Sequence, residues 1–322
     1  MKILLILLTL TAIIFAGCQH NVESEGVTQM HEFTRDTKVV DVINCKSFDG
    51  FGRLIFPLRG VDRNLTLKNL DDVLIWYTEV NPDKTVEIVN YMRDIADAGE
   101  KIFFDIYTAD EKLADPRKND TGLFFFRGRP NAKFAICNAG GGFHYVGAMH
   151  DSFPHALELS KRGYNAFALI YRPDAQLACE DLARAIAFVH THADELQVDA
   201  DGYSLWGGSA GARMAAWLGS FGTENFGEKK YPPPAAVIMQ YTGLGEVYGN
   251  EPPTYNCVGT RDSIANWRTM DARIKRIRAN GTPAEIEIFD GLSHGFGLGE
   301  GTIAHGWLDR AINFWQQNIG GI

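Results

Sequence analysis

The chain is short of several features that would place it in other classes of protein. Its 322 residues contain only five cysteines and no CxxC pair, which argues against a structural zinc site or a thioredoxin-like centre. There is no HExxH motif and no run rich in Lys and Arg. With a net charge of −9, the chain lacks the basic footprint of a nucleic-acid-binding protein, so we expect no nucleic acid partner.

The N-terminus lacks the run of about 20 apolar residues that a membrane-spanning helix needs. The apolar stretch from Ile3 to Phe15 is shorter, as in the core of a signal peptide, and it ends in Ala16-Gly17-Cys18, which resembles a bacterial lipobox. We therefore expect a signal peptide over 1–17 and a polar tether over 18–38. The lipidated Cys18 would be the only membrane contact of an exported protein of the cell envelope, facing the periplasm or the outer membrane. An ordinary secretory signal with a chance cysteine is the alternative.

The rest of the chain has the pattern of an α/β protein. After three short strands that favour an antiparallel start, strands alternate with helices of about ten or more residues, such as those expected over 175–196 and 210–219. This predicts a mostly parallel central sheet with helices on both faces and ligands bound at the carboxyl ends of the strands. We assign 101–322 to this catalytic domain. Residues 39–100 show helical patterns without a chemical motif, and we expect a small helical flank or cap there.

The most informative motif follows the strand expected over 203–206. This strand runs directly into Gly207-Gly208-Ser209-Ala210-Gly211, a G-x-S-x-G sequence, and a helix comes next. A sharp turn between strand and helix requires small neighbours and projects the serine Oγ toward substrate, at the positive end of the helix dipole. Ser209 is therefore the predicted nucleophile. A glycine turn that only packs a strand against a helix is the alternative.

A serine nucleophile needs a base, and the base needs an acid that orients it. In this type of sheet the acid and then the histidine follow the serine along the chain. Asp262 and His294 have this order, and each lies just beyond the carboxyl end of a predicted strand. Asp290 is the rival acid, but it lies only four residues before His294 in the same loop. Of the other histidines, His144, His150 and His155 precede the serine and so have the wrong order.

Two glycine-bearing segments follow other predicted strands. In Asn138-Ala139-Gly140-Gly141-Gly142-Phe143, the backbone N–H groups of Gly141 and Gly142, together with that of Ala210, are expected to form an oxyanion hole. The segment matches neither G-x-G-x-x-G nor a phosphate loop ending in Lys-Ser/Thr, so phosphate binding is disfavoured. The second segment, over 241–245, is expected to be a turn near the substrate pocket.

Several ordered motifs resemble the carbohydrate-esterase branch of the α/β hydrolases, which includes acetyl-xylan-esterase-like and feruloyl-esterase-like bacterial enzymes. The motifs are the glycine loop with Phe143-His144-Tyr145, Gly163-Tyr164-Asn165-Ala166 before a strand ending in Tyr171-Arg172, the serine turn, and Ser293-His294-Gly295-Phe296. The resemblance covers 101–322 and implies an α/β-hydrolase fold, an acyl-enzyme mechanism and no metal or organic cofactor. One departure is Asn138-Ala139, where relatives often carry His-Gly, so the support of the glycine loop is an open question.

The resemblance and the expected export favour one reaction, the hydrolysis of short-chain acyl esters. The expected substrate is a small ester or an acylated oligosaccharide, with acetyl groups on a xylan-type carbohydrate as the leading candidate. A serine peptidase of the prolyl-oligopeptidase type would use the same triad, although such enzymes usually carry a propeller or a larger cap. A catalytically inactive envelope binding protein is a third interpretation, but it conflicts with an intact Ser, Asp and His in the expected order.

Overall fold

The computed structural model describes residues 32–58, 61–62 and 64–320. The predicted signal peptide, Cys18 and most of the predicted tether lie outside the described residues. The described residues from Phe33 onward form a single compact unit. Phe33 belongs to the predicted tether, yet its backbone N–H donates to Asn90 Oδ1 (2.9 Å) and its carbonyl accepts from Asn90 Nδ2 (2.8 Å). The folded unit therefore begins ahead of residue 39, where the flank was expected to start.

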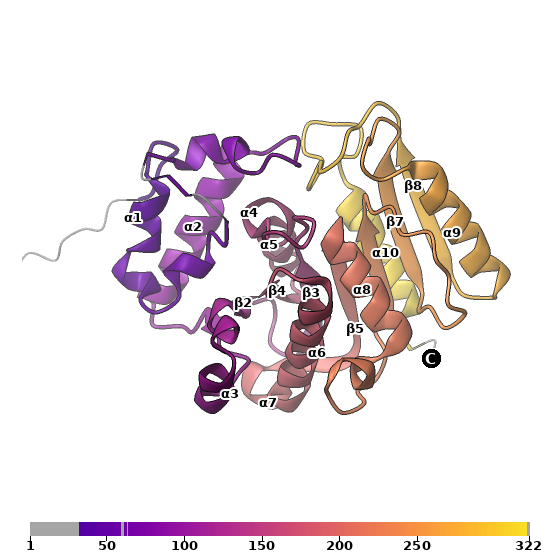
Figure 1. Ribbon diagram of the computed structural model, residues 1–322, viewed down its shortest axis with the longest axis horizontal. Helices are drawn as coiled ribbons and strands as arrows, with labels where there is room; N and C mark the ends of the chain where they lie inside the picture. The colour runs from indigo at the N-terminus through magenta and orange to yellow at the C-terminus, as the bar shows by residue number, and fades with distance from the viewer. Residues whose placement is uncertain (1–31, 59–60, 63, 321–322) are drawn as a thin grey trace, which may run out of the picture. The chain divides into compact units, whose positions relative to one another are not determined.

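A mixed, mostly parallel sheet forms the middle layer of this unit (Figure 1). Its strands in the described residues are β1 (Phe103–Phe104), β2 (Gly122–Phe126), β3 (Ala132–Asn138), β4 (Asn165–Ile170), β5 (Val198–Gly208), β6 (Ala236–Gln240), β7 (Thr254–Gly259) and β8 (Ala284–Phe289). Their order across the sheet is β1-β2-β4-β3-β5-β6-β7-β8. Only β1 with β2 and β2 with β4 pair antiparallel. The antiparallel arrangement expected for the first three strands does not extend to β3, because β3 runs parallel to both β4 and β5.

Helices cover both faces of the sheet. The helices that pack on or beside it are α5 (Phe153–Lys161), α6 (Ala175–Thr191), α7 (Ala193–Leu196), α8 (Ala210–Phe221), α9 (Trp267–Ala279) and α10 (Trp307–Asn318). Figure 1 shows α6 and α8 in front of the sheet and α10 behind it. The single helix expected over 175–196 is two helices, because the chain leaves helical geometry at His192. The mostly parallel α/β architecture expected from the sequence is confirmed.

The remaining helical elements are short, apart from α2. They are α1 (Val39–Ile43), η1 (Lys46–Phe48), η2 (Gly52–Leu54), η3 (Leu67–Asp72), α2 (Pro82–Asp97), α3 (Ala109–Ala114), η4 (Pro116–Asp120), α4 (Ala148–Asp151) and η5 (Thr223–Phe226). Within the described residues, no helix combines the length and the apolar character needed to cross a membrane.

The helical flank over 39–100 shares its core with the sheet. Phe51, just before η2, stacks on Phe103 of β1 (ring centroids 5.1 Å apart) and meets the edge of Phe124 of β2 (5.8 Å). In α2, Asn81 caps the helix by accepting from the N–H of Asp83 (3.0 Å), and Pro82 suits the first turn because its missing N–H needs no partner there. The division of the chain at residue 100 remains a prediction about domain organisation, but the packing is continuous across it.

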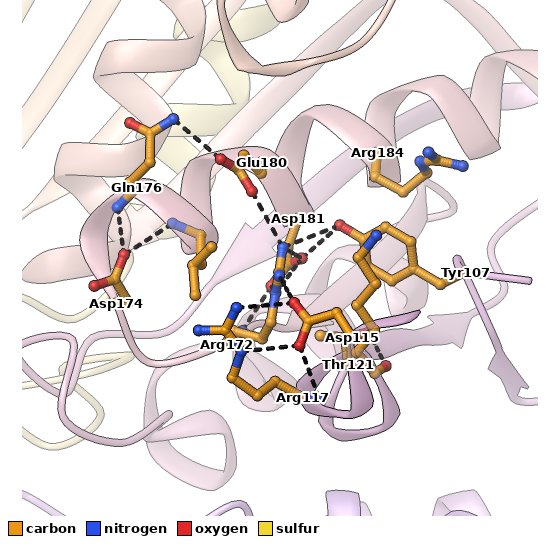
Figure 2. A network of polar contacts seen from close by, with 12 residues as sticks. Tyr107, Asp115, Arg117, Thr121, Arg172, Asp174, Gln176, Glu180, Asp181 and Arg184 are labelled. Carbon is orange, nitrogen blue, oxygen red and sulfur yellow. Dashed lines mark hydrogen bonds and ion pairs between the residues drawn. The ribbon is translucent and has the colours of Figure 1, made fainter. Parts of the chain in front are cut away.

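A buried network of charges holds the turn between β4 and α6 (Figure 2). The guanidinium of Arg172 donates to both carboxylate oxygens of Asp181 (2.8 to 3.1 Å), and both side chains are buried. The hydroxyl of Tyr107 donates to the same carboxylate (2.6 Å). Tyr171, which precedes Arg172 in the chain, donates its hydroxyl to the carbonyl of Ala139 (2.6 Å). The network therefore fixes a turn that supports the glycine loop.

We expect Asp181→Ala to lower the free energy of unfolding by about 3 kcal/mol, because it removes the fully buried partner of the Arg172 charge and leaves only the more exposed Asp115 and Glu180. Urea denaturation followed by circular dichroism measures this change. Asp120→Ala is the matched control: its partner is Arg53, both side chains are about half exposed or more, and such pairs contribute about 0–1 kcal/mol. Equal losses in the two variants would contradict the structural role assigned to the buried network.

Candidate active site

Ser209 lies at the sharp turn between β5 and α8, where G-x-S-x-G was expected to place it. Its backbone angles are φ +50° and ψ −114°, which are costly for any residue other than glycine. A β-carbon on Gly207 would collide with the backbone of Gly211, and one on Gly211 would collide with the carbonyl of Asn138. The small neighbours are therefore required by close backbone packing. The N–H of Ser209 donates to the carbonyl of Gln240 (3.0 Å), which ties the turn to the end of β6.

The structure brings Ser209, His294 and Asp262 into one hydrogen-bonded chain. His294 Nε2 lies 3.1 Å from Ser209 Oγ, and His294 Nδ1 lies 2.8 Å from Asp262 Oδ2. The Asp262 side chain is fully buried, and its other oxygen accepts from the N–H groups of Ile264 (2.8 Å) and Ala265 (2.6 Å). With Nδ1 protonated, the imidazole can take a proton from Oγ while the carboxylate holds the resulting imidazolium.

The hydrogen bonds of Asp262 and Asp290 bear on two expectations, the start of the helix after β7 and the choice between the two candidate acids. A helix was expected from Ile264, but α9 begins at Trp267, because the N–H groups of Ile264 and Ala265 are turned toward the Asp262 carboxylate. The rival acid, Asp290, accepts instead from the hydroxyl of Thr260 (2.8 Å) in an exposed position. Of the two acids, Asp262 is the one bonded to His294.

The flank holds the backbone of the loop that carries His294. The hydroxyl of Thr78 donates to the carbonyl of His294 (2.9 Å), and the N–H of Thr78 donates to the carbonyl of Gly295 (3.0 Å). His150 donates from Nε2 to the same carbonyl of Gly295 (2.8 Å). Burial lowers the pKa of His150 to about 4, so the ring is neutral at physiological pH and Nε2–H is the donor. A segment without a chemical motif in the sequence thus positions the predicted base.

The glycine loop after β3 lies against Ser209. A β-carbon built on Gly140 would lie 2.8 Å from the Ser209 Cβ, and Gly141 and Gly142 have φ angles of +119° and +60°, in the region that favours glycine. Between residues 64 and 320, the N–H groups of Gly141, Gly142 and Ala210 donate no hydrogen bond to the protein. Within the described residues, the three predicted oxyanion donors are therefore free to donate to a ligand, as stabilisation of a tetrahedral intermediate requires.

The support of this loop, left open by the Asn138-Ala139 departure, comes from neighbouring strands. Asn138 donates from Nδ2 to the carbonyl of Trp206 in β5 (2.8 Å), and Tyr171 after β4 donates to the carbonyl of Ala139. Two polar side chains thus hold the start of the loop between its two neighbouring strands.

Asp151 is the site residue that the sequence analysis missed. Its buried carboxylate accepts from the N–H of Gly140 (2.7 Å) and from the hydroxyls of Tyr77 (3.3 Å) and Tyr241. A β-carbon on Gly208 would collide with the same carboxylate, so Asp151 lies directly beneath both the glycine loop and the serine turn. The available signal was the one carboxylate in the mostly apolar segment over 146–157, shortly after the glycine loop. Its partners come from four separate segments, which no local pattern indicates.

Burial raises the pKa of Asp151 from 3.8 to about 6, although its hydrogen bonds favour the charged form. The folded state therefore binds the proton of Asp151 more tightly than the unfolded chain does. The resulting stabilisation is fully present at pH values below the pKa that Asp151 has in the unfolded chain. This stabilisation is lost as the pH rises through the pKa that Asp151 has in the folded state. We expect the stability of Asp151→Asn relative to wild type to rise by about 3 kcal/mol between about pH 4 and pH 7.

Urea denaturation at several pH values in this window measures that difference. The buried His150 and His155, whose pKa values are lowered to about 4 and about 3, act in both proteins and cancel in the comparison. Asp120→Asn, at an exposed position, should show no such slope. A difference between Asp151→Asn and wild type that stays constant with pH would contradict the burial argument.

Aromatic side chains near the site fall into two groups. Phe143, next to Gly142, stacks on Trp217 of α8 (ring centroids 6.3 Å apart, planes 11° apart), and Tyr145 stacks on Trp76 of the flank (5.4 Å, 21°). Both pairs border the glycine loop. Trp206, also considered for the pocket, is instead buried against Trp307 and Trp315, so it belongs to the core.

The family model BD-FAE matches residues 128–242. This stretch includes the glycine loop and the serine turn and ends before Asp262 and His294. Comparison with curated protein sequences gives no match.

Solved structures show the same fold. The chain is similar to esterase 2 of Thermogutta terrifontis with propionate bound (21% identity, TM-score 0.55), covering 68% of this chain and 94% of that one. The same esterase phosphorylated by paraoxon aligns at 20% identity (TM-score 0.55, 69% and 96%). An acetyl ester-xyloside bifunctional hydrolase of Caldicellulosiruptor lactoaceticus aligns at 22% identity (TM-score 0.58, 68% and 97%). At these identities the similarity shows the fold, and the expected α/β-hydrolase fold is confirmed.

Proposed function

We propose that this protein is a serine carboxylesterase that hydrolyses short-chain acyl esters through an acyl-enzyme. One observation carries the proposal: Ser209 Oγ, the imidazole of His294 and the carboxylate of Asp262 form a continuous hydrogen-bonded chain at the carboxyl end of the sheet. This is the arrangement that activates a serine hydroxyl.

The proposed reaction proceeds in two halves. His294 Nε2 takes the proton of Ser209 as Oγ attacks the ester carbonyl, and Asp262 holds the imidazolium that forms. The N–H groups of Gly141, Gly142 and Ala210 stabilise the oxyanion. The imidazolium then gives its proton to the departing alcohol, which leaves an acyl group on Ser209. Water, deprotonated by His294, attacks the acyl carbonyl, and the carboxylic acid is released as Oγ regains its proton.

We propose acetyl groups on a xylan-type carbohydrate as the natural substrate. The resemblance of the glycine loop, the serine turn and the His294 loop to carbohydrate esterases supports this, as does the match of residues 128–242 to BD-FAE. The similar fold of the acetyl ester-xyloside hydrolase agrees with the same substrate class. We also propose that the enzyme is anchored to the bacterial envelope through Cys18. Incorporation of labelled palmitate in a bacterial host, retained in Cys45→Ala and lost in Cys18→Ala, would support the anchor.

The test of function compares p-nitrophenyl acetate, butyrate and octanoate with acetylated xylo-oligosaccharides, from which released acetate is measured. We expect turnover of acetate esters, with kcat/KM lower by about tenfold or more on octanoate than on acetate. A Gly-Pro p-nitroanilide serves as the peptidase probe. Cleavage of this probe without ester turnover would establish the peptidase alternative. No turnover of any substrate by folded protein would favour the inactive binding protein.

A further inference from the structure

Arg213 places a cation close to the predicted nucleophile. It lies four residues after Ser209, and its backbone N–H donates to the Ser209 carbonyl (3.3 Å). Helical Cα–Cβ bonds tilt toward the helix N-terminus, so the side chain extends back toward Ser209. A β-carbon built on Gly243 would lie 3.7 Å from Arg213 Nη2 and 3.7 Å from the carbonyl oxygen of Ile264. The guanidinium therefore lies beside Gly243, in a segment after β6 that also faces the turn after Asp262.

The Arg213 guanidinium has no partner among the residues that the structure describes, although the side chain is half-buried. Three other half-buried or buried arginines are in ion pairs: Arg162 with Glu158 and Asp309, Arg172 with Asp181, and Arg184 with Glu111 and Glu228. The buried Arg273 donates instead to the backbone carbonyl of Glu246 (3.0 Å), whereas Arg213 has neither kind of partner among the described residues. A partly desolvated guanidinium offers a planar fork of donors that matches a carboxylate. Its position one helical turn after the reacting serine points to an anionic ligand rather than an internal ion pair.

A row of aromatic rings crosses α8 beside Arg213. Trp217 lies one turn further along the same helix face and stacks on Phe143, the residue that follows the glycine loop. Its indole N–H donates to the hydroxyl of Tyr248 (3.3 Å), whose ring packs against Phe221 (centroids 4.6 Å apart). Tyr248 is 39% exposed and Phe221 is 37% exposed. Such rings present an apolar face with a polar edge, which suits the alternating C–H faces and hydroxyl edges of a sugar chain.

We propose that Arg213 and the aromatic row of Phe143, Trp217 and Tyr248 form a subsite for the acidic sugar of a carboxylate-bearing oligosaccharide. The inference rests on the proposed esterase function and narrows its substrate class. Arg213 binds the carboxylate of a uronic acid close to the scissile ester, and the rings pack against neighbouring sugars. The enzyme thus removes acetyl groups from uronate-bearing chains in preference to neutral ones.

The test measures kcat/KM for acetylated xylo-oligosaccharides of equal length, with and without a glucuronic acid branch. We expect wild type to prefer the acidic substrate by about tenfold or more, the factor that one charge-assisted contact supplies. In Arg213→Gln the ratio should fall toward one, and Arg213→Lys should recover part of it. Arg268→Gln is the control, because it removes the same charge from an exposed position at the start of α9.

Two results would overturn the inference while leaving the esterase function intact: a wild-type ratio near one, or an unchanged ratio in Arg213→Gln. Calorimetric binding of non-acetylated oligosaccharides tests the subsite without any chemical step. Here the acidic chain should bind more tightly than the neutral chain in wild type but not in Arg213→Gln. Equal binding of the two chains would refute the subsite even if no ester were hydrolysed. Absence of ester turnover with a retained binding preference would refute only the esterase function.

Discussion

Ser209→Ala will lower kcat on p-nitrophenyl acetate by a factor on the order of 10⁵ without loss of the folded structure. The variant keeps the unpaired N–H groups of Gly141, Gly142 and Ala210, so a small residual rate over water is expected from oxyanion stabilisation and binding alone. It lacks the oxygen that lies 3.1 Å from His294 Nε2, so no acyl-enzyme can form. Steady-state kinetics measure the loss, and thermal denaturation checks the fold.

Ser220→Ala is the control for this change. Ser220 lies on the same helix, and its buried hydroxyl has no hydrogen-bond partner in the described part of the chain. Its removal should leave kcat unchanged. Retention of more than about one hundredth of the wild-type rate by Ser209→Ala would contradict the role of the hydroxyl as nucleophile.

Asp262→Asn will lower kcat by about 10⁴-fold. The amide would place an N–H donor or a neutral oxygen beside His294 Nδ1, and it would no longer balance the positive charge of the imidazolium. Because Ile264 and Ala265 donate to the other oxygen, the amide is held in place rather than free to turn away. The measurement is kcat on p-nitrophenyl acetate near neutral pH, with substrate affinity followed through KM, which should change little.

Asp290→Asn provides the matched comparison, since it is the same substitution on the loop of His294 itself. Asp290 bonds to Thr260 rather than to His294, so we expect a change in kcat of no more than about twofold. A larger loss in Asp290→Asn than in Asp262→Asn would reverse the choice of acid.

Local patterns in the sequence were enough to predict most of the elements of the catalytic domain and all three residues of the proposed triad. Strand and helix periodicity predicted the alternation from β4 onward, and the G-x-S-x-G turn placed Ser209 between β5 and α8. Asp262 and His294 could be found because each follows a strand, and parallel strands bring their carboxyl ends to one edge. These inferences need only neighbours in the chain and one rule of topology.

Contacts between distant segments were decided by the tertiary structure alone. Thr78 bonds to the carbonyl of His294 across 216 residues, and Tyr77 bonds to Asp151 across 74. A hydrogen bond of this kind depends on which surfaces the folded chain brings together, and a residue's chain neighbours do not encode it. The position of β4 between β2 and β3 in the sheet is likewise decided by the tertiary structure.

Arg213 combines features that the sequence predicts with features that only the tertiary structure decides. Its place four residues after Ser209, on the helix face of Trp217, follows from the sequence and from helical periodicity. Its guanidinium has no acidic partner among the described residues and lies beside Gly243. Both facts follow only from the packing of the strand-end loops around α8. The sequence by itself thus determined the fold class and the candidates for the reactive side chains. The tertiary structure decided what supports them and which charges remain free to meet a substrate, because pairing depends on distance in space rather than along the chain.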